Sequence, residues 1–272
     1  MTGGGAAPAG RHRGARTDGE RPDGERPGGE RPGGDPAAGI VHLVGAGPGD
    51  PLLLTRRAAR LLGEADVVVA DRRSSDAIVA LAPPEAERCY VGRTPEGPAW
   101  SLYRIVEMLT DHAAAGRRVV RLKSGDLFVC SRAAEEMAAL LARGVQVTTT
   151  PGVSAATAAP LAAGSAPPPG TRVTVASGDA DDPVLAPVDW EALADPGSTL
   201  VVLTGRAHQR SIADRLVAAG LSGTTPAAVV HAAGRSGTRV APTDLAGLGG
   251  TRLPPPATVV IGPMIGAGDA HP

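Results

Sequence analysis

Short apolar runs alternate with amphipathic stretches along the chain from residue 39 onward. Apolar runs of this length, bounded by turn residues, are typical of buried strands. In the first half they fall at residues 40–44, 67–70, 119–122 and 145–149. Between them, apolar residues recur at helical spacing over about residues 51–62, 101–115 and 133–143. Strands that alternate with helices in this way predict a mostly parallel sheet covered on both faces.

A proline- and glycine-rich stretch at residues 166–170 separates this unit from a second one. The second unit has apolar runs near residues 171–176, 199–203, 227–231 and 258–261, and a helical pattern over about residues 209–219. We therefore expect a two-lobed α/β fold in which each lobe is a mostly parallel sheet flanked by helices. The N-terminal lobe would span residues 39–165 and the C-terminal lobe residues 171–266, with a ligand cleft between them.

Residues 1–38 differ in kind from the rest of the chain. They repeat G-E-R-P units and contain no Val, Ile, Leu or aromatic residue. Such a segment cannot bury a core, so we expect a disordered tail. Its acidic and basic residues balance, which favours a spacer over a basic targeting arm.

Composition excludes several classes of partner. Lys and Arg number 27 against 28 Asp and Glu, so the net charge is −1 and no global field attracts nucleic acid or an anionic membrane. Aromatic residues are only 2% of the chain, too few for a base-stacking platform. The chain has no apolar run long enough to span a membrane and no apolar N-terminal stretch typical of a signal peptide. We expect a cytoplasmic protein.

The two cysteines, Cys89 and Cys130, stand in unlike contexts. A disulfide framework is excluded, and without clustered His or Asp they predict no metal site. The simplest interpretation is that both are small, buried, apolar residues.

The loop G-A-G-P-G-D at residues 45–50 lies between a predicted strand and a predicted helix. A dinucleotide fingerprint would need a small residue in place of Asp50, whose carboxylate would meet a pyrophosphate at the helix N-terminus. The order of strand, glycine loop and helix, and the acidic Asp71 about twenty residues on, are the points in favour of nicotinamide binding, and the second is a common coincidence. Asp50 and Pro51 instead suit the N-cap and the first helical position. A plain strand-to-helix turn would explain the glycines but not the prolines on both sides of Gly49.

The string V-G-A-G-P-G-D-P-L-L-L-T, from Val44 to Thr55, resembles the opening signature of the tetrapyrrole methylases. Four more blocks follow in the family's order: V-V-V-A-D ending at Asp71, Y-V-G-R from Tyr90, R-L-K-S-G-D-L-F-V from Arg121, and T-P-G-V-S-A from Thr150 with A-A-P from Ala158. Weaker likenesses are L-V-V-L-T-G from Leu200, P-A-A-V-V from Pro226 and P-A-T-V-V-I-G from Pro256. The resemblance covers about residues 40–265 and is closest to the uroporphyrinogen-III C-methyltransferases.

This resemblance implies two α/β lobes, a homodimer, and S-adenosylmethionine in the cleft as methyl donor, with no metal. The implied reaction is C-methylation of the tetrapyrrole uroporphyrinogen III to precorrin-2, in sirohaem or cobalamin biosynthesis. Donor contacts carried over by motif fall on Pro48, Ser124, Gly125, Asp126, Val129, Ser154, Ala155, Thr204 and Ala233. Loops after parallel strands suit ligands, and small residues let the backbone approach a bulky one. Ser154 could equally be an ordinary helix N-cap, and the two roles are compatible.

The resemblance gives Asp71 the role of proton acceptor, although a strand-end aspartate can also simply cap the following turn. The lysine that serves as proton donor in many relatives is Arg93 here. Arginine cannot act as a general acid, but it could bind a substrate carboxylate bidentately. Because the substrate is a polycarboxylate, we expect cleft arginines to hold it; the candidates by position are Arg72, Arg73, Arg93, Arg132 and Arg172.

Several positions depart from the family pattern. Ser124 replaces the first glycine of G-G-D, and Leu127 replaces the following proline. Residues 130–134 read C-S-R-A-A in place of F-G-R-G-G, and residues 164–170 lack the T-H-R of the family. Three hypotheses stay open. The first is a uroporphyrinogen-III C-methyltransferase, the second a diverged paralogue with another acceptor, and the third a donor-binding module without turnover.

Overall fold

The computed structural model describes residues 39–71, 76–92, 100–165, 167, 169–178, 188–204, 209–254 and 256–262. The predicted tail at residues 1–38 lies outside them. The described residues all belong to one compact unit, residues 35–272. None of the described helices is long and apolar enough to cross a membrane.

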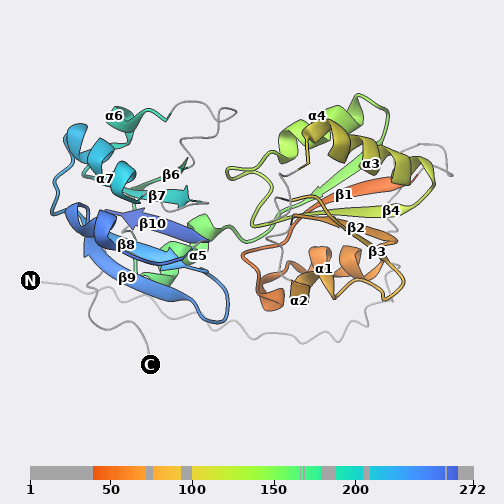
Figure 1. Ribbon diagram of the computed structural model, residues 1–272, viewed down its shortest axis with the longest axis horizontal. Coiled ribbons are helices and arrows are strands. Elements are labelled where there is room, and N and C mark those ends of the chain that lie inside the picture. The colour runs from red at the N-terminus through yellow and green to blue at the C-terminus, as the bar shows by residue number, and fades with distance from the viewer. Residues whose placement is uncertain are drawn as a thin grey trace, which may run out of the picture. The chain divides into compact units, whose positions relative to one another are not determined.

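A five-stranded parallel sheet organises the first lobe in the described part of the chain (Figure 1). Its strands stand in the order β3-β2-β4-β1-β5, and every pairing between neighbours is parallel. The strands are β1 (Ile40–Gly45), β2 (Val67–Ala70), β3 (Glu87–Tyr90), β4 (Arg118–Lys123) and β5 (Gln146–Thr150). The four predicted strands and their parallel arrangement are thus confirmed, and β3 is an additional edge strand.

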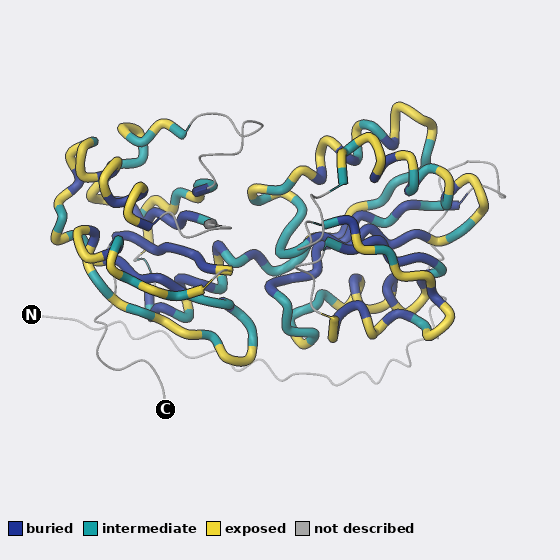
Figure 2. Tube along the Cα trace, viewed as in Figure 1, coloured by how far each residue is buried: buried dark blue, intermediate teal, exposed yellow. Residues whose placement is uncertain are grey.

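Helices cover both faces of this sheet. Leu61 and Leu62 pack with Val68 and Ile78 on one face, where α1 and α2 lie. Ile105, Leu109 and Leu140 form the core on the opposite face, beneath α3 and α4. The bounds are α1 (Arg56–Gly63), α2 (Asp76–Val79), α3 (Leu102–Ala114) and α4 (Ala133–Leu141). Figure 2 shows the result: the central strands β1, β2 and β4 are mostly buried, and the helices expose their outer faces.

The helix predicted from Pro51 begins later than expected. Residues Pro51–Leu53 form a short 3-10 turn, η1, whose N-cap is Asp50; its carboxylate accepts from the Leu52 N–H at 2.8 Å. A second cap, Thr55, accepts from the Ala58 N–H at 3.2 Å and starts α1 at Arg56. The predicted cap at Asp50 is therefore confirmed, but two successive caps divide the expected helix in two.

The second lobe holds a five-stranded sheet of different character within the described residues, with order β6-β7-β10-β8-β9. Only β6 and β7 pair in parallel; the other three pairings are antiparallel. The strands are β6 (Arg172–Ser177), β7 (Ser198–Thr204), β8 (Pro226–His231), β9 (Arg239–Asp244) and β10 (Ala257–Ile261). The two-lobed α/β fold is confirmed, but the expected mostly parallel second sheet is wrong. A short loop joins β8 to β9 as a hairpin, which only antiparallel strands permit.

Helices also cover the second sheet. On one face, Ile212 and Leu216 of α7 join a core that includes Leu248. On the other face, Ala159 of α5 and the adjacent Ala163 pack with residues of β8 and β10. The elements are α5 (Ala155–Ala162), α6 (Trp190–Leu193), α7 (Gln209–Ala218) and the 3-10 helix η2 (Ala246–Gly250). The lobe boundary expected at residue 165 assigned α5 to the first lobe, whereas its core contacts are with the second sheet.

Candidate functional site

Three loops meet at the carboxyl edge of the first sheet, one after each of the adjacent strands β4, β1 and β5. The backbones of Gly47 and Gly125 form two hydrogen bonds. The Gly47 N–H donates to the Gly125 carbonyl at 3.0 Å, and the Gly125 N–H donates to the Gly47 carbonyl at 2.8 Å. Both have positive φ, 69° and 74°, which favours glycine. A Cβ at Gly152 would lie only 2.7 Å from the Gly45 carbonyl carbon. These glycines are needed because three backbones converge here.

Asp126 ties two of these loops together. Its Oδ2 accepts from the Phe128 and Val129 N–H groups at 2.8 and 3.3 Å, and its Oδ1 accepts from the Gly152 N–H at 3.1 Å. Burial alone would raise the pKa of this carboxyl, but the backbone donors outweigh burial and hold the pKa below its ordinary value. Asp126 is therefore a charged anchor for the loops after β4 and β5.

One edge of the second sheet also contributes residues to the site. Because β10 runs antiparallel to β7 and β8, its first residue, Ala257, pairs with Thr204 and His231 at the ends of those strands. In the loop after β8, Arg235 donates its Nε–H to the Pro48 carbonyl in a short hydrogen bond. A Cβ at Gly234 would lie 2.6 Å from Pro48 Cγ. The loop after β8 thus packs directly on the glycine loop after β1.

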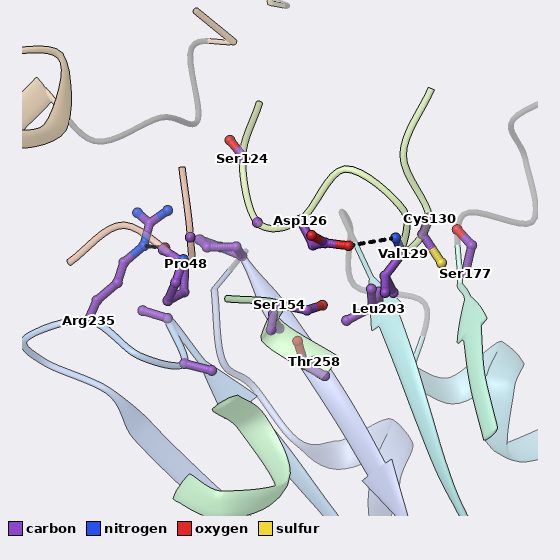
Figure 3. Close-up of a pocket in the computed structure, with 17 residues that line it drawn as sticks. Pro48, Ser124, Asp126, Val129, Cys130, Ser154, Ser177, Leu203, Arg235 and Thr258 are labelled. Carbon is purple, nitrogen blue, oxygen red and sulfur yellow. Dashed lines mark hydrogen bonds between the residues drawn. The ribbon is translucent and has the colours of Figure 1, made fainter. Parts of the chain in front are cut away.

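A cavity of about 240 Å³ lies where these segments meet (Figure 3). Eight of the nine predicted donor-binding residues line it: Pro48, Ser124, Gly125, Asp126, Val129, Ser154, Ala155 and Ala233. The ninth, Thr204, follows the lining residue Leu203 at the end of β7. Among the described lining residues, Asp126 and Arg235 carry the charges. The residues that the motifs selected over a span of almost 200 positions therefore come together in one pocket.

Two serines of the pocket differ in their hydrogen bonding. Ser154 is the N-cap of α5, because its Oγ accepts from the Ala156 N–H at 3.1 Å, so the predicted capping role is confirmed. The Ser124 Oγ is buried and has no hydrogen-bond partner among the described residues. An unsatisfied buried hydroxyl costs about 1–3 kcal/mol. A ligand with a polar group in this pocket could supply the missing partner.

Several lining residues were not predicted from the sequence. Leu203 and Pro256 stand inside the weaker blocks that resemble the family, so a signal for them existed. Arg235 had none, because its contact with Pro48 joins positions 187 residues apart. The unpredicted lining residues are Gly47, Cys130, Ser177, Leu203, Ala232, Arg235, Pro256, Ala257 and Thr258.

The cysteines are less simple than expected. Cys130 is exposed in the pocket wall with φ 49°, so the expected burial is wrong. Cys89 is half-buried, and its sulfur, a Glu87 oxygen and a His112 nitrogen lie within 4.8 Å of one another. The premise that no histidine clusters with a cysteine is therefore wrong. Arg117 donates to Glu87 at 2.7 Å and its Nη1 lies 3.1 Å from His112 Nδ1, so a protein cation already sits in this cluster.

Asp71 follows β2, the strand beside β4 at the same sheet edge, but it does not line the cavity. The Arg121 guanidinium donates to Asp71 Oδ1 at 2.7 Å. The side chain of Asp71 stays 28% exposed, so solvent or a ligand can still reach it. The alternative, a cap on the following turn, falls on residues 72–75, outside the described part of the chain.

The predicted substrate arginines are only partly visible. Arg72, Arg73 and Arg93 lie outside the described residues. Arg132 precedes α4, is 46% exposed, and forms an ion pair with Glu135 at 2.7 Å. Arg172 pairs with Asp195 at the start of β6, whereas the pocket lies at the end of that strand, so its placement in the cleft is wrong.

Comparison with known proteins agrees with this geometry. The family model for Tetrapyrrole (Corrin/Porphyrin) Methylases matches residues 41–249. A siroheme synthase of Nitrosococcus oceani is 39% identical over 240 residues, 85% of this chain and 50% of the relative. A siroheme synthase of Pseudomonas aeruginosa is 41% identical over 201 residues, 72% of this chain and 42% of the relative. The chain therefore belongs to the tetrapyrrole methylase family, and it spans about half the length of these curated relatives.

Solved structures match in fold. The uroporphyrin-III C-methyl transferase of Thermus thermophilus, complexed with S-adenyl homocysteine, has a TM-score of 0.69 and 36% identity. The match covers 82% of this chain and 92% of that one. A cobalt precorrin-4 methyltransferase of cobalamin biosynthesis has a TM-score of 0.72 and 27% identity, over 82% of this chain and 94% of the other.

Proposed function

We propose that this chain is an S-adenosylmethionine-dependent methyltransferase that methylates carbons of uroporphyrinogen III in succession, giving precorrin-2 for sirohaem or cobalamin biosynthesis. The observation that carries the proposal is the cavity in which eight residues selected by family motifs meet. The Thermus thermophilus relative, 36% identical, was crystallised with S-adenyl homocysteine, the product form of such a donor. We further propose that the chain is cytoplasmic and that it forms a homodimer, as the family resemblance implies for the latter.

The residues present fit such a donor. Ser154, Ala155 and Ala233 are small, so a folded nucleoside can approach the backbone closely. Ser124 and Gly125 add further small residues to the lining of the pocket. The backbone donors that hold Asp126 favour its charged carboxylate, and a negative charge in the lining would favour a cationic donor.

The chemistry asks the protein chiefly for alignment and for removal of a proton. The donor supplies a methyl group already activated by the sulfonium charge; the carbon–carbon bond forms as the carbon–sulfur bond breaks. The pocket would hold the donor by the loops after β1, β4 and β5, which are rigid because their backbones pack together. Asp71 would accept the proton that the methylated pyrrole carbon must lose.

Arginines would bind the substrate carboxylates. Arg132 would exchange its exposed partner Glu135 for a propionate or acetate, since an exposed ion pair contributes little. Arg93 would bind a carboxylate rather than donate a proton, because a guanidinium does not deprotonate at working pH. Arg72 and Arg73 are the further candidates for binding substrate carboxylates.

A family member with another acceptor is the second candidate. The observation that favours it is the pocket wall after β4, where Cys130 takes the place of the phenylalanine in the family's F-G-R-G-G segment and adopts a positive φ. A donor pocket without turnover is a third outcome of the same test.

The test is to incubate the purified protein with uroporphyrinogen III and S-adenosylmethionine and to follow the absorbance of oxidised precorrin-2. We expect product that depends on both substrates. Donor binding without product from uroporphyrinogen III would contradict the first candidate. Methylation of a different tetrapyrrole in that case would favour the second candidate, and none would favour the donor-binding module.

A further inference from the structure

Four charged side chains form a connected cluster beneath the sheet edge where Asp71 lies. Arg121 and Lys123 come from β4, and Glu136 comes from α4. Arg121 is 1% exposed, Lys123 8% and Glu136 3%. Asp71 is the one member that solvent reaches readily. We call these four residues the Asp71 network.

Every hydrogen-bonding direction of the Arg121 guanidinium is used. Its Nε and Nη2 donate to the two carboxylate oxygens of Glu136 at 2.9 and 3.1 Å, a bidentate pair. Its Nη1 donates to the carbonyls of Val69 and Leu122 at 3.3 and 3.2 Å. Its Nη2 also donates to Asp71 Oδ1 at 2.7 Å. The guanidinium is thus fixed from three sides, and its remaining direction holds Asp71.

The charges in the Asp71 network balance. Lys123 Nζ lies 2.6 Å from Glu136 Oε1, so two cations face two carboxylates. Burial alone would lower the pKa of the Arg121 guanidinium, but Asp71 and Glu136 outweigh burial and raise the pKa. Arg121 therefore stays charged, and its guanidinium pairs with the carboxylates of both Glu136 and Asp71.

Stability alone does not explain this arrangement, because apolar residues of similar volume often stabilise a core as well as a buried ionic cluster does. What the cluster does provide is a fixed position for one carboxylate. Among the described residues, the hydrogen bonds of the Asp71 side chain go to Arg121 and involve Oδ1. The described residues supply no hydrogen bond to Oδ2, and because the side chain is 28% exposed, a substrate could meet that oxygen.

We propose that Arg121, fixed by Glu136 and Lys123, is a positioning residue that anchors one oxygen of Asp71 and thereby presents the other to the substrate. This inference rests on the proposed function, in which Asp71 accepts a proton. Arg121 itself need not touch the substrate.

The test compares kcat, KM and S-adenosylhomocysteine affinity in Arg121→Met and wild-type protein. Misplacing a reacting group by about 1 Å costs about a hundredfold in rate, so we expect kcat to fall about that much. KM and the Kd for S-adenosylhomocysteine should stay within about twofold, because Arg121 does not line the cavity. The matched control is Arg118→Met, which removes an arginine paired with Asp66 from the other end of β4 and should leave kcat unchanged.

A double-mutant cycle with Asp71→Asn separates positioning from general support of the fold. The readout is the transfer of a labelled methyl group. Arg121→Met should slow the reaction strongly when it is introduced into the wild-type protein, and hardly at all when it is introduced into the Asp71→Asn variant. If Arg121→Met does not fold, Arg121→Lys and Glu136→Gln take its place, with a smaller loss of kcat expected under the same cycle. Two results would overturn this inference and leave the proposed function standing. One is an equal loss of rate on Arg121→Met in wild type and in Asp71→Asn, and the other is a wild-type kcat in Arg121→Met. Absence of product from wild type overturns the proposed function and this inference with it.

Discussion

Asp71 and Asp126 follow neighbouring strands at one sheet edge, yet their surroundings differ. Asp126 accepts from three backbone N–H groups and serves the loops. Asp71 is anchored on one oxygen, and its side chain stays 28% exposed. At the scale of the residue, the same functional group is therefore fixed for two purposes, one structural and one proposed to be chemical.

Asp71→Asn keeps the size of the side chain and removes its basicity. Positioned acid–base groups typically contribute about 10²–10⁴ in rate, so we expect the initial rate of methylation to fall by about that range. The affinity for S-adenosylhomocysteine, measured by calorimetric titration, should stay within about twofold of wild type. Unchanged turnover would rule out the role of proton acceptor.

Asp126→Asn should alter the dependence of stability on pH. The pKa of Asp126 is lowered in the folded chain, so its contribution is fully present above the ordinary value of 3.8 and is lost as the pH falls through the folded-state pKa. We expect the variant to unfold at lower urea concentration than wild type at pH 7, with the difference shrinking in acid. Asp214→Asn, on the exposed face of α7, is the control. A difference independent of pH would contradict this account.

Residue types and order were enough to select most of the pocket, because the motifs mark positions where the backbone must come close to a ligand. They could not select Arg235 or Glu136. Arg235 contacts the glycine loop across 187 positions, and Glu136 looks like any polar residue of an amphipathic helix. Such partners become visible only once the chain is folded.

At the scale of the element, glycine loops set the shape of the site. Gly45, Gly125 and Gly152 approach so closely that a Cβ at Gly45 or at Gly152 would strike the backbone of the other two glycines. This crowding links the ends of β1, β4 and β5 into one rigid floor. It explains why the family-like blocks that contain these glycines lie at the ends of β1, β4 and β5.

Gly152→Ala should therefore weaken donor binding by distorting the loops locally, and it should affect the rest of the fold less. Its Cβ would lie 2.7 Å from the Gly45 carbonyl carbon, and overpacking of this kind costs about 1–3 kcal/mol. We expect S-adenosylhomocysteine affinity to fall about tenfold or more. Gly63→Ala, where a Cβ meets nothing within 4 Å, should bind as wild type does. Equal affinities for the two variants would contradict the role given to Gly152.

The two strands that sequence patterns missed share a physical cause. β3 reads E-R-C-Y and is largely exposed, and β9 reads R-V-A-P-T-D with a proline at the sheet edge. Neither has the apolar run that marks a buried strand. The buried strands β1, β2 and β4 were predicted because both of their faces are covered by helices.

At the scale of the whole molecule, the site depends on strand direction in both sheets. The first sheet brings three loops to its carboxyl edge because its strands are parallel. In the second sheet, the antiparallel β10 brings Pro256, Ala257 and Thr258 to the edge where β7 and β8 end. The apolar runs of the buried strands could be predicted from the sequence, but this pairing could not, because it joins segments far apart along the chain.

Titration of S-adenosylhomocysteine by calorimetry tests most directly the central claim, that this pocket holds the methyl donor. We expect wild type to bind one equivalent and to unfold at a higher temperature when it is bound. Ala155→Phe, which fills the pocket from the start of α5, should abolish binding. Ala192→Phe, on the exposed α6, should not. No binding by wild type, or undiminished binding by Ala155→Phe, would contradict the claim.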